Sequence, residues 1–123
     1  MDLSRRRGWQ LAHSDRSATV FVASSVRARL LGLALLDDLP GDVALLLPRC
    51  RSVHTIGMRF ALDLAFLDAR AHPLRIDRAV GPGRLRSCRR ARFVLETRAG
   101  HADPLVEHLP VLLDRHAQPV CPS

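Results

Sequence analysis

The feature that most constrains the fold is a pair of strand-like segments joined by a short polar link. Residues 62–67 and 74–80 carry apolar side chains mainly at alternate positions, and residues 68–71 form a tight link between them. A two-residue period is that of a β-strand, because successive side chains point to opposite faces of a sheet. The pattern predicts a β-hairpin, and with it an antiparallel sheet.

Shorter segments on both sides of this hairpin supply the other predicted elements. Strands are expected at 18–23, 43–47, 92–97 and 111–113, where β-branched, aromatic or continuous apolar residues lie between Ser, Pro and Gly breakers. A helix is expected after Ser24 and Ser25, whose hydroxyls can cap its first turn, and it should end by 37–41. Asp103 followed by Pro104 predicts a second, short helix through Glu107 or His108.

Length and composition indicate one folded domain. The chain has 123 residues, 47% of them hydrophobic and 25% charged, which is typical of a globular protein with a packed core. We expect residues 1–16 to be an N-terminal arm or edge strand and residues 117–123 to be a loose tail. The compact domain should then span residues 17–116.

The net charge of +7 favours partners that are anionic. All 19 basic residues are arginine, a bias that a GC-rich coding sequence produces whatever the protein does, so the charge is weak evidence by itself. Five arginines lie within Arg84–Arg92, a number that can bind phosphate or an RNA backbone. No aromatic residue interleaves them as a base-stacking surface requires, and a solvated loop is the favoured interpretation.

The cysteines and the apolar runs bear on the compartment. Three cysteines, with no Cys-x-x-Cys pair, favour free thiols in a reducing cytosol over a disulfide framework or a zinc ribbon. No apolar run approaches the ~18 residues that a membrane-spanning helix needs, and the basic N-terminus is not followed by the apolar region of a signal peptide. We expect a soluble, cytoplasmic protein without a membrane span or a cofactor.

The segment Cys50–Asp68 combines reactive side chains with a strand-like run. Cys50, His54 and Met58 are four residues apart, so they share one face of either a helix or a strand, and thiolate, imidazole and thioether are ligands that suit Cu(I). The spacing is not specific to a metal site, and Pro48 and Gly57 argue against one continuous element. We therefore expect no metal.

Asp63 stands out as an ionisable group at the head of an apolar strand. Burying a carboxylate is costly unless it is paired or hydrogen-bonded, and His54, Thr55 and Arg59 are the candidate partners nearest in sequence. One interpretation is catalytic, with Cys50 as the nucleophile and a His54–Asp63 pair for acid–base chemistry. The other, which we favour, is that Asp63 accepts hydrogen bonds from backbone N–H groups at the entrance of the strand.

An ordered series of motifs resembles a known family. His54-Thr55-Ile56-Gly57-Met58-Arg59-Phe60-Ala61-Leu62-Asp63 closely resembles the signature of domain of unknown function 192, a group of small prokaryotic proteins. Arg29 with Gly32-Leu33, and Val94-Leu95-Glu96 with Ala99-Gly100, are similar to its flanking motifs, so the likeness spans about residues 20–113. The resemblance implies an α+β fold, with a curved, mostly antiparallel sheet or partial barrel and one or two short helices. It implies no activity.

Three functional hypotheses follow. The leading one is a non-enzymatic binding or accessory module, for a small ligand or a protein partner, with a shallow pocket near Cys50–Asp63 lined by residues drawn from His54, Thr55, Met58, Arg59 and Asp63. The second is an enzyme that uses Cys50 and His54 as a thiolate–imidazolium pair. The third is nucleic-acid binding through the loop Arg84–Arg92.

Overall fold

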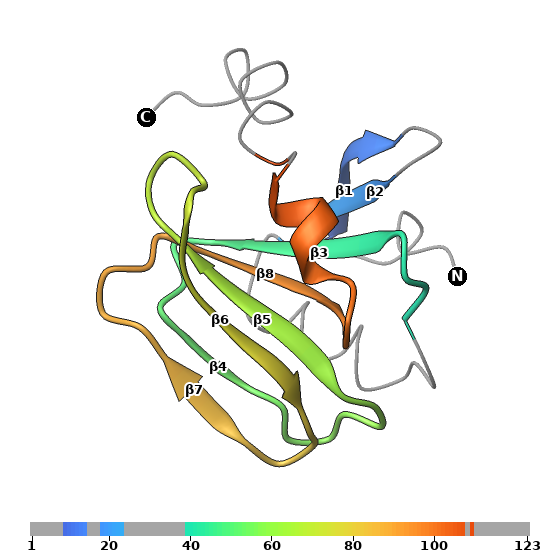
Figure 1. Ribbon diagram of the computed structural model, residues 1–123, viewed down its shortest axis with the longest axis vertical. Helices are drawn as coiled ribbons and strands as arrows, with labels where there is room; N and C mark the ends of the chain where they lie inside the picture. Colours follow the sequence, from blue (N-terminus) through green and yellow to red (C-terminus); the bar gives the residue numbers. More distant parts are fainter. Residues whose placement is uncertain (1–8, 15–17, 24–38, 108, 110–123) are drawn as a thin grey trace.

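The computed structural model describes residues 9–14, 18–23, 39–107 and 109, and within them the chain forms two sheets (Figure 1). The larger sheet has six strands in the order β1-β2-β3-β8-β5-β6, and the smaller pairs β4 with β7. The strands are β1 (Trp9–Ser14), β2 (Thr19–Ala23), β3 (Val43–Pro48), β4 (Ser52–His54), β5 (Leu62–Leu67), β6 (Pro73–Val80), β7 (Leu85–Ser87) and β8 (Phe93–Arg98).

The larger sheet is mostly antiparallel and open. The predicted hairpin is confirmed as β5 and β6, and β8 lies between β3 and β5, antiparallel to both. Strands β2 and β3 are parallel to each other, which makes the sheet mixed. Strands β1 and β6 are its two edges in the described part of the chain, so the expectation of a partial barrel is replaced by an open sheet, while the sheet-dominated α+β class is confirmed.

Both faces of the larger sheet are covered, which explains why its central strands are apolar throughout. One face packs against Val53 and Met58 from the region of the smaller sheet, and the other packs against Leu105 and Val106 of a short helix over residues 102–107 (Figure 1). Every residue of β5 is buried. A strand buried on both faces needs apolar side chains at all positions, and this makes the buried Asp63 an exception that requires partners.

The two sheets are joined by a side chain of the edge strand β6. The Arg75 guanidinium donates to the backbone oxygen of Ser87 at 2.7 Å and pairs with Asp77, and it lies 4.8 Å from the centroid of the Phe66 ring. Charged side chains on an edge strand also discourage pairing with a further strand. Strand β6 is therefore both tied to β7 and protected along its edge.

Several sequence predictions are confirmed and others need correction. The predicted strands at 18–23, 43–47 and 92–97 correspond to β2, β3 and β8. The arginine-rich segment expected to be a loop contains strand β7, and the short helix begins at residue 102, ahead of its predicted cap at Asp103. The predicted helix after Ser24 and Ser25, the strand at 111–113 and the tail at 117–123 lie outside the described residues. Within the described residues, no helix has the length and apolar character to cross a bilayer.

The link between β5 and β6 is stabilised by Asp68, and this predicts a pH effect. Hydrogen bonds from the backbone N–H groups of His72 and Arg70 lower the pKa of Asp68 below its ordinary value of 3.8. A carboxyl whose pKa falls on folding contributes stability above its unfolded pKa and loses that contribution as the pH falls through its folded pKa. We expect the difference in unfolding free energy between the wild type and Asp68→Asn to shrink as the pH is lowered from about 6 to about 2. Urea denaturation over this range measures it, and a difference that does not vary with pH would contradict the role of the charge.

Candidate functional site

The segment singled out in the sequence, from Cys50 to Asp63, links the larger sheet to the smaller one and back again. It leaves the end of β3, forms β4, turns at residues 55–58 and enters β5 (Figure 1). Most of its candidate side chains are turned inward: Thr55, Met58 and Asp63 are buried, and Cys50 and His54 are half-buried. Among the candidates of this segment, only Arg59 is exposed.

Thr55 fastens two loops to each other. Its hydroxyl donates to the backbone oxygen of Gly81 at 2.7 Å and accepts from the backbone N–H of Arg84 at 2.8 Å. Its own N–H donates to the Arg84 oxygen, and its oxygen accepts from Met58 and Gly83. Since Thr55 is 0% exposed, these bonds are shielded from water, and they hold the 55–58 turn rigidly against the 81–84 loop.

Asp63 is a structural acceptor for three backbone N–H groups from two distant parts of the chain. One carboxylate oxygen, Oδ1, accepts from Ala79 at 2.8 Å, and the other, Oδ2, accepts from Gly100 at 3.0 Å and Ala102 at 3.4 Å. The carboxylate is 1% exposed. These bonds go to the backbone and none goes to His54, so in the described structure the His54–Asp63 pair is not a hydrogen-bonded one.

The backbone around Asp63 needs this acceptor. The register of β5 and β6 shifts so that Asp63 faces two residues, Arg78 and Ala79, and Ala79 has a φ of 50°. A β-bulge of this kind leaves a backbone group without a partner in the ladder, and the left-handed conformation is strained for a residue with a Cβ. Gly100 has a φ of 89°, which glycine adopts without that strain. Asp63 therefore holds a bulge and a sharp turn in place.

Arg78, beside the bulge, is engaged at the surface. Its guanidinium forms a two-pronged pair with the Asp103 carboxylate, at 2.8 Å and 2.9 Å. The hydrogen bond and charge of Asp103, with a smaller effect from Asp63, raise the pKa of Arg78, and the same pair lowers the pKa of Asp103. Both side chains are more than half exposed, so solvent screens the pair and its contribution to stability is small.

Two of the three soft side chains, Cys50 and Met58, pack in the same core cluster, and His54 is not part of that cluster. The Met58 side chain is buried in the core cluster, and the Cys50 thiol donates to the backbone oxygen of Ser52 at 3.3 Å. His54 pairs with Leu85 across the smaller sheet, and its Nδ1 atom is buried. Among the residues that the structure describes, no group of three His, Cys, Asp or Glu side chains is arranged to hold a metal ion.

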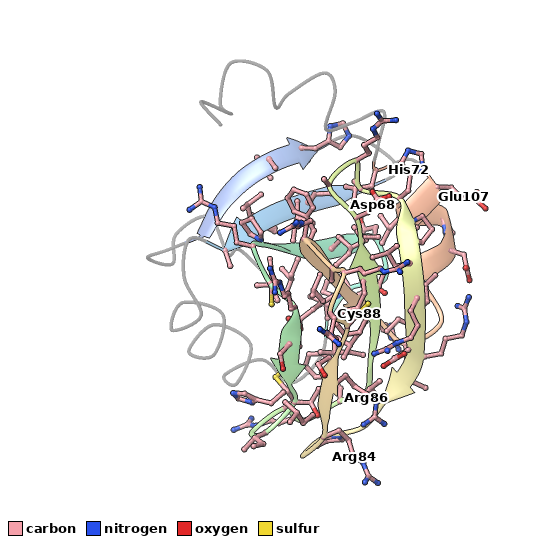
Figure 2. All side chains as sticks on the ribbon, turned by 90° about the vertical axis from the view of Figure 1, so that its left-hand side faces the viewer. Asp68, His72, Arg84, Arg86, Cys88 and Glu107 are labelled. Carbon is pink, nitrogen blue, oxygen red and sulfur yellow. The ribbon has the colours of Figure 1, made fainter. Side chains whose placement is uncertain are left out.

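The arginines of the segment Arg84–Arg92 are divided between the two sides of strand β7 along the chain. Strand β7 separates them: Arg84 precedes the strand, Arg86 is its middle residue, and Cys88 follows it and leads to Arg89, Arg90 and Arg92 (Figure 2). Arg86 lies 3.6 Å from the Asp77 carboxylate. The chain at the second end also runs beside Arg49 and Arg51, which the sequence interpretation did not include, because the Cys88 N–H donates to Arg51 and the Cys50 N–H donates to Arg92.

The sequence did not predict two further features: two large apolar side chains that are exposed, and a glutamate that is fully buried. Ile56 and Leu85 are 65% and 67% exposed, at the end of the molecule that Thr55 fastens. In β8, Glu96 is 0% exposed, between Leu45 and Leu64 of the neighbouring strands. A charged residue inside an apolar strand was the available signal for Glu96. No local pattern could distinguish an exposed Ile56 from a buried one.

Solved structures from other organisms have a similar fold. A "putative transcription regulator" from Sinorhizobium meliloti 1021 is 23% identical, with a TM-score of 0.62 over 72% of this chain and 74% of that one. A protein of unknown function from Novosphingobium aromaticivorans DSM 12444 is 13% identical, with a TM-score of 0.61 over 85% of this chain and 91% of that one. At these identities the likeness shows the fold alone.

One protein family includes most of this chain, as its family model shows. No curated protein matches the chain. The family model DUF192, described as "Uncharacterized ACR, COG1430", matches residues 9–106, which is most of the chain and includes every strand of both sheets. The resemblance seen in the sequence is therefore confirmed, and the chain belongs to the DUF192 family of uncharacterised proteins.

Proposed function

We propose that this protein is a non-enzymatic binding module that contacts a partner protein through its apolar tip, defined as Ile56 and Leu85 with the loops that carry them. The observation that carries the proposal is the exposure of these two large apolar side chains, 65% and 67%, in the 55–58 turn and at the start of β7, which hydrogen bonds hold together. Single exposed apolar residues are common on protein surfaces. Here two of them lie at one end of the molecule, because each directly follows a member of the hydrogen-bonded pair Thr55 and Arg84.

The Thr55 hydrogen bonds support a binding role because they order the tip in advance. Association is opposed by the entropy lost when loops and side chains become fixed, so a surface that is already rigid binds more tightly for the same contacts. The bonds from Thr55 to Gly81, Gly83 and Arg84 join the two loops of the tip. The tip is thus prepared for contact while its apolar side chains remain in water.

Charge indicates what kind of partner fits. Arg84, which directly precedes Leu85, and Arg59, three residues after Ile56, are exposed, and the whole chain carries a net charge of +7. An apolar centre with a positive rim complements a partner surface that has an apolar ridge flanked by Asp or Glu. A small-ligand site deeper in the segment is less well supported, since Asp63 and Thr55 direct their oxygens at backbone groups. A cytoplasmic location fits the free thiol of Cys88.

Selection from a random peptide library tests the proposal without a known partner. The wild type should enrich peptides that combine acidic and large apolar residues, and the double variant Ile56→Ser, Leu85→Ser should not. Truncating exposed side chains leaves the core unchanged, so the variant should unfold at the same temperature as the wild type. A matched control is Leu11→Ser, Leu74→Ser, which removes two other exposed apolar side chains, 53% and 41% exposed, away from the tip.

Three results would contradict the proposal. The first is enrichment of the same peptides by the wild type and the tip variant, and the second is a loss of binding in the control variant as large as in the tip variant. The third is a wild-type dimer, measured by sedimentation equilibrium, that the tip variant dissociates, because the occupant of the tip would then be a second copy of this chain.

A further inference from the structure

Five exposed arginines gather beyond the end of strands β4 and β7 that is farther from the apolar tip. They belong to the two chain segments 49–51 and 89–92, which run side by side because Cys50 donates to Arg92 at 3.3 Å and Cys88 donates to Arg51 at 2.8 Å. These segments are the left end of the molecule in Figure 1, and Figure 2 views them face on, with Cys88 near the middle. We call this surface the arginine end; its members are Arg49, Arg51, Arg89, Arg90 and Arg92.

None of these arginines takes part in an ion pair within the described structure. The described ion pairs involve other arginines, Arg75, Arg78 and Arg86. The acidic residue at this end is Asp68, which follows Leu67 in the chain. The Leu67 backbone oxygen accepts from the Arg92 N–H, and the Asp68 carboxylate accepts from backbone N–H groups within its own turn. Five like charges on two adjacent loops repel one another, so the isolated protein gains no stability from gathering them.

The backbone conformation of Arg49 is a second feature that opposes folding, in addition to the repulsion between the charges. Its φ of 55° is in the left-handed region, which is uncommon and strained for residues with a Cβ. Backbone strain of this kind is found more often at functional sites than elsewhere. The arginine end therefore combines two features that oppose folding, and an anionic partner would relieve one of them, the repulsion between the guanidinium groups.

We propose that the arginine end binds the phosphate backbone of a nucleic acid duplex, independently of sequence. Guanidinium groups bind phosphate oxygens in pairs of hydrogen bonds, and a row of five on two loops matches several successive phosphates better than a single small anion. A duplex is favoured over a single strand because the five arginines have no exposed aromatic side chain among them for bases to stack on.

The distribution of apolar side chains argues against a lipid surface as the partner. Proteins that bind membranes from one side insert large apolar side chains among the lipids. In the described part of the chain, the large apolar residues that are exposed are Leu11, Ile56, Leu74 and Leu85, and none belongs to segments 49–51 or 89–92. Charge without an apolar anchor fits a polyanion in solution.

Fluorescence anisotropy with a labelled 20-base-pair duplex tests the proposal. If all five arginines contact phosphates, the affinity should fall about 500-fold between 50 mM and 200 mM salt, since each contact contributes about 0.9 to the slope of log K against log salt. Arg92→Gln should lower that slope by about 1, and Arg89→Gln with Arg90→Gln by about 2. The matched control is Arg98→Gln, because both arginines are exposed and β8 separates them: Arg92 directly precedes the strand and Arg98 is its last residue. This control should leave the slope unchanged.

The outcomes separate the proposal from its alternatives. A smaller slope in the arginine-end variants, with unfolding temperatures equal to that of the wild type, supports it. Any of the following would overturn it: no wild-type binding at 50 mM salt, equal effects of Arg92→Gln and Arg98→Gln, tighter binding to a single strand of the same length, or binding to phosphatidylserine vesicles but not to the duplex. None of these measurements depends on the apolar tip.

Discussion

Replacing Asp63 by alanine is expected to lower the free energy of unfolding by about 3–5 kcal/mol. Three backbone N–H groups, those of Ala79, Gly100 and Ala102, would lose the carboxylate that accepts from them. Asp63 is 1% exposed, so these N–H groups are not in contact with bulk water. The expected loss is a large fraction of the stability of a typical domain, about 5–15 kcal/mol, and chemical denaturation monitored by circular dichroism measures it.

Two further variants keep this prediction testable if the alanine variant fails to fold. Asp63→Asn retains one acceptor oxygen but turns an NH₂ group toward N–H donors, so a smaller loss of about 2–3 kcal/mol is expected. Asp42→Ala is the matched control, since Asp42 is exposed, and its effect should stay within about 0.5 kcal/mol. A loss below about 1 kcal/mol for Asp63→Ala would show that the carboxylate does not support the bulge and turn.

Replacing Thr55 by valine is expected to cost about 2–3 kcal/mol of unfolding free energy. Valine has nearly the same shape, but it leaves the Gly81 oxygen and the Arg84 N–H without the hydroxyl that bonds them at 2.7 Å and 2.8 Å. Because these bonds join the two loops of the apolar tip, Thr55→Val should also weaken the binding of any peptide selected by the tip. Denaturation and peptide titration measure the two effects separately.

Thr55→Ser is the control that isolates the hydroxyl. Serine keeps the donor and acceptor and removes one methyl group, so the expected loss is about 1 kcal/mol, with peptide binding retained. Equal losses in the serine and valine variants would mean that packing of the methyl group, and not the hydrogen bonds, holds the loops together. Peptide binding that survives in Thr55→Val would mean that rigidity of the tip is not needed for function.

The parts of the fold that could be predicted from the sequence are those encoded locally. Alternation in 62–67 and 74–80 predicted the hairpin β5–β6, and apolar runs between breakers predicted β2, β3 and β8. The three-residue strands β4 and β7 were missed, since three residues are too few to show a period. Two features of the sheet had no local signal: the parallel pairing of β2 with β3, and the position of β8 between β3 and β5.

The candidate site, too, has features that depend on local sequence and features that depend on distant residues. The sequence identified Asp63 as a group that needs partners, because the cost of burying a carboxylate depends only on its chemistry and on the apolar strand around it. It could not identify those partners, since Ala79 and Gly100 are 16 and 37 residues away along the chain. The spacing of Cys50, His54 and Met58 was equally uninformative, because a shared face says nothing of whether that face meets the core or solvent.

By itself, then, the sequence determined the family, the antiparallel hairpin at the centre of the chain and the excess of positive charge, all of which depend on the order and chemistry of neighbouring residues. Only the tertiary structure decided where that charge gathers and which apolar side chains stay in water. The arginine end joins Arg49 and Arg51 to residues 89–92, and the apolar tip joins Ile56 to Leu85. Such surfaces arise when pairing between distant strands brings two loops together, and that pairing is set by the packing of the whole chain.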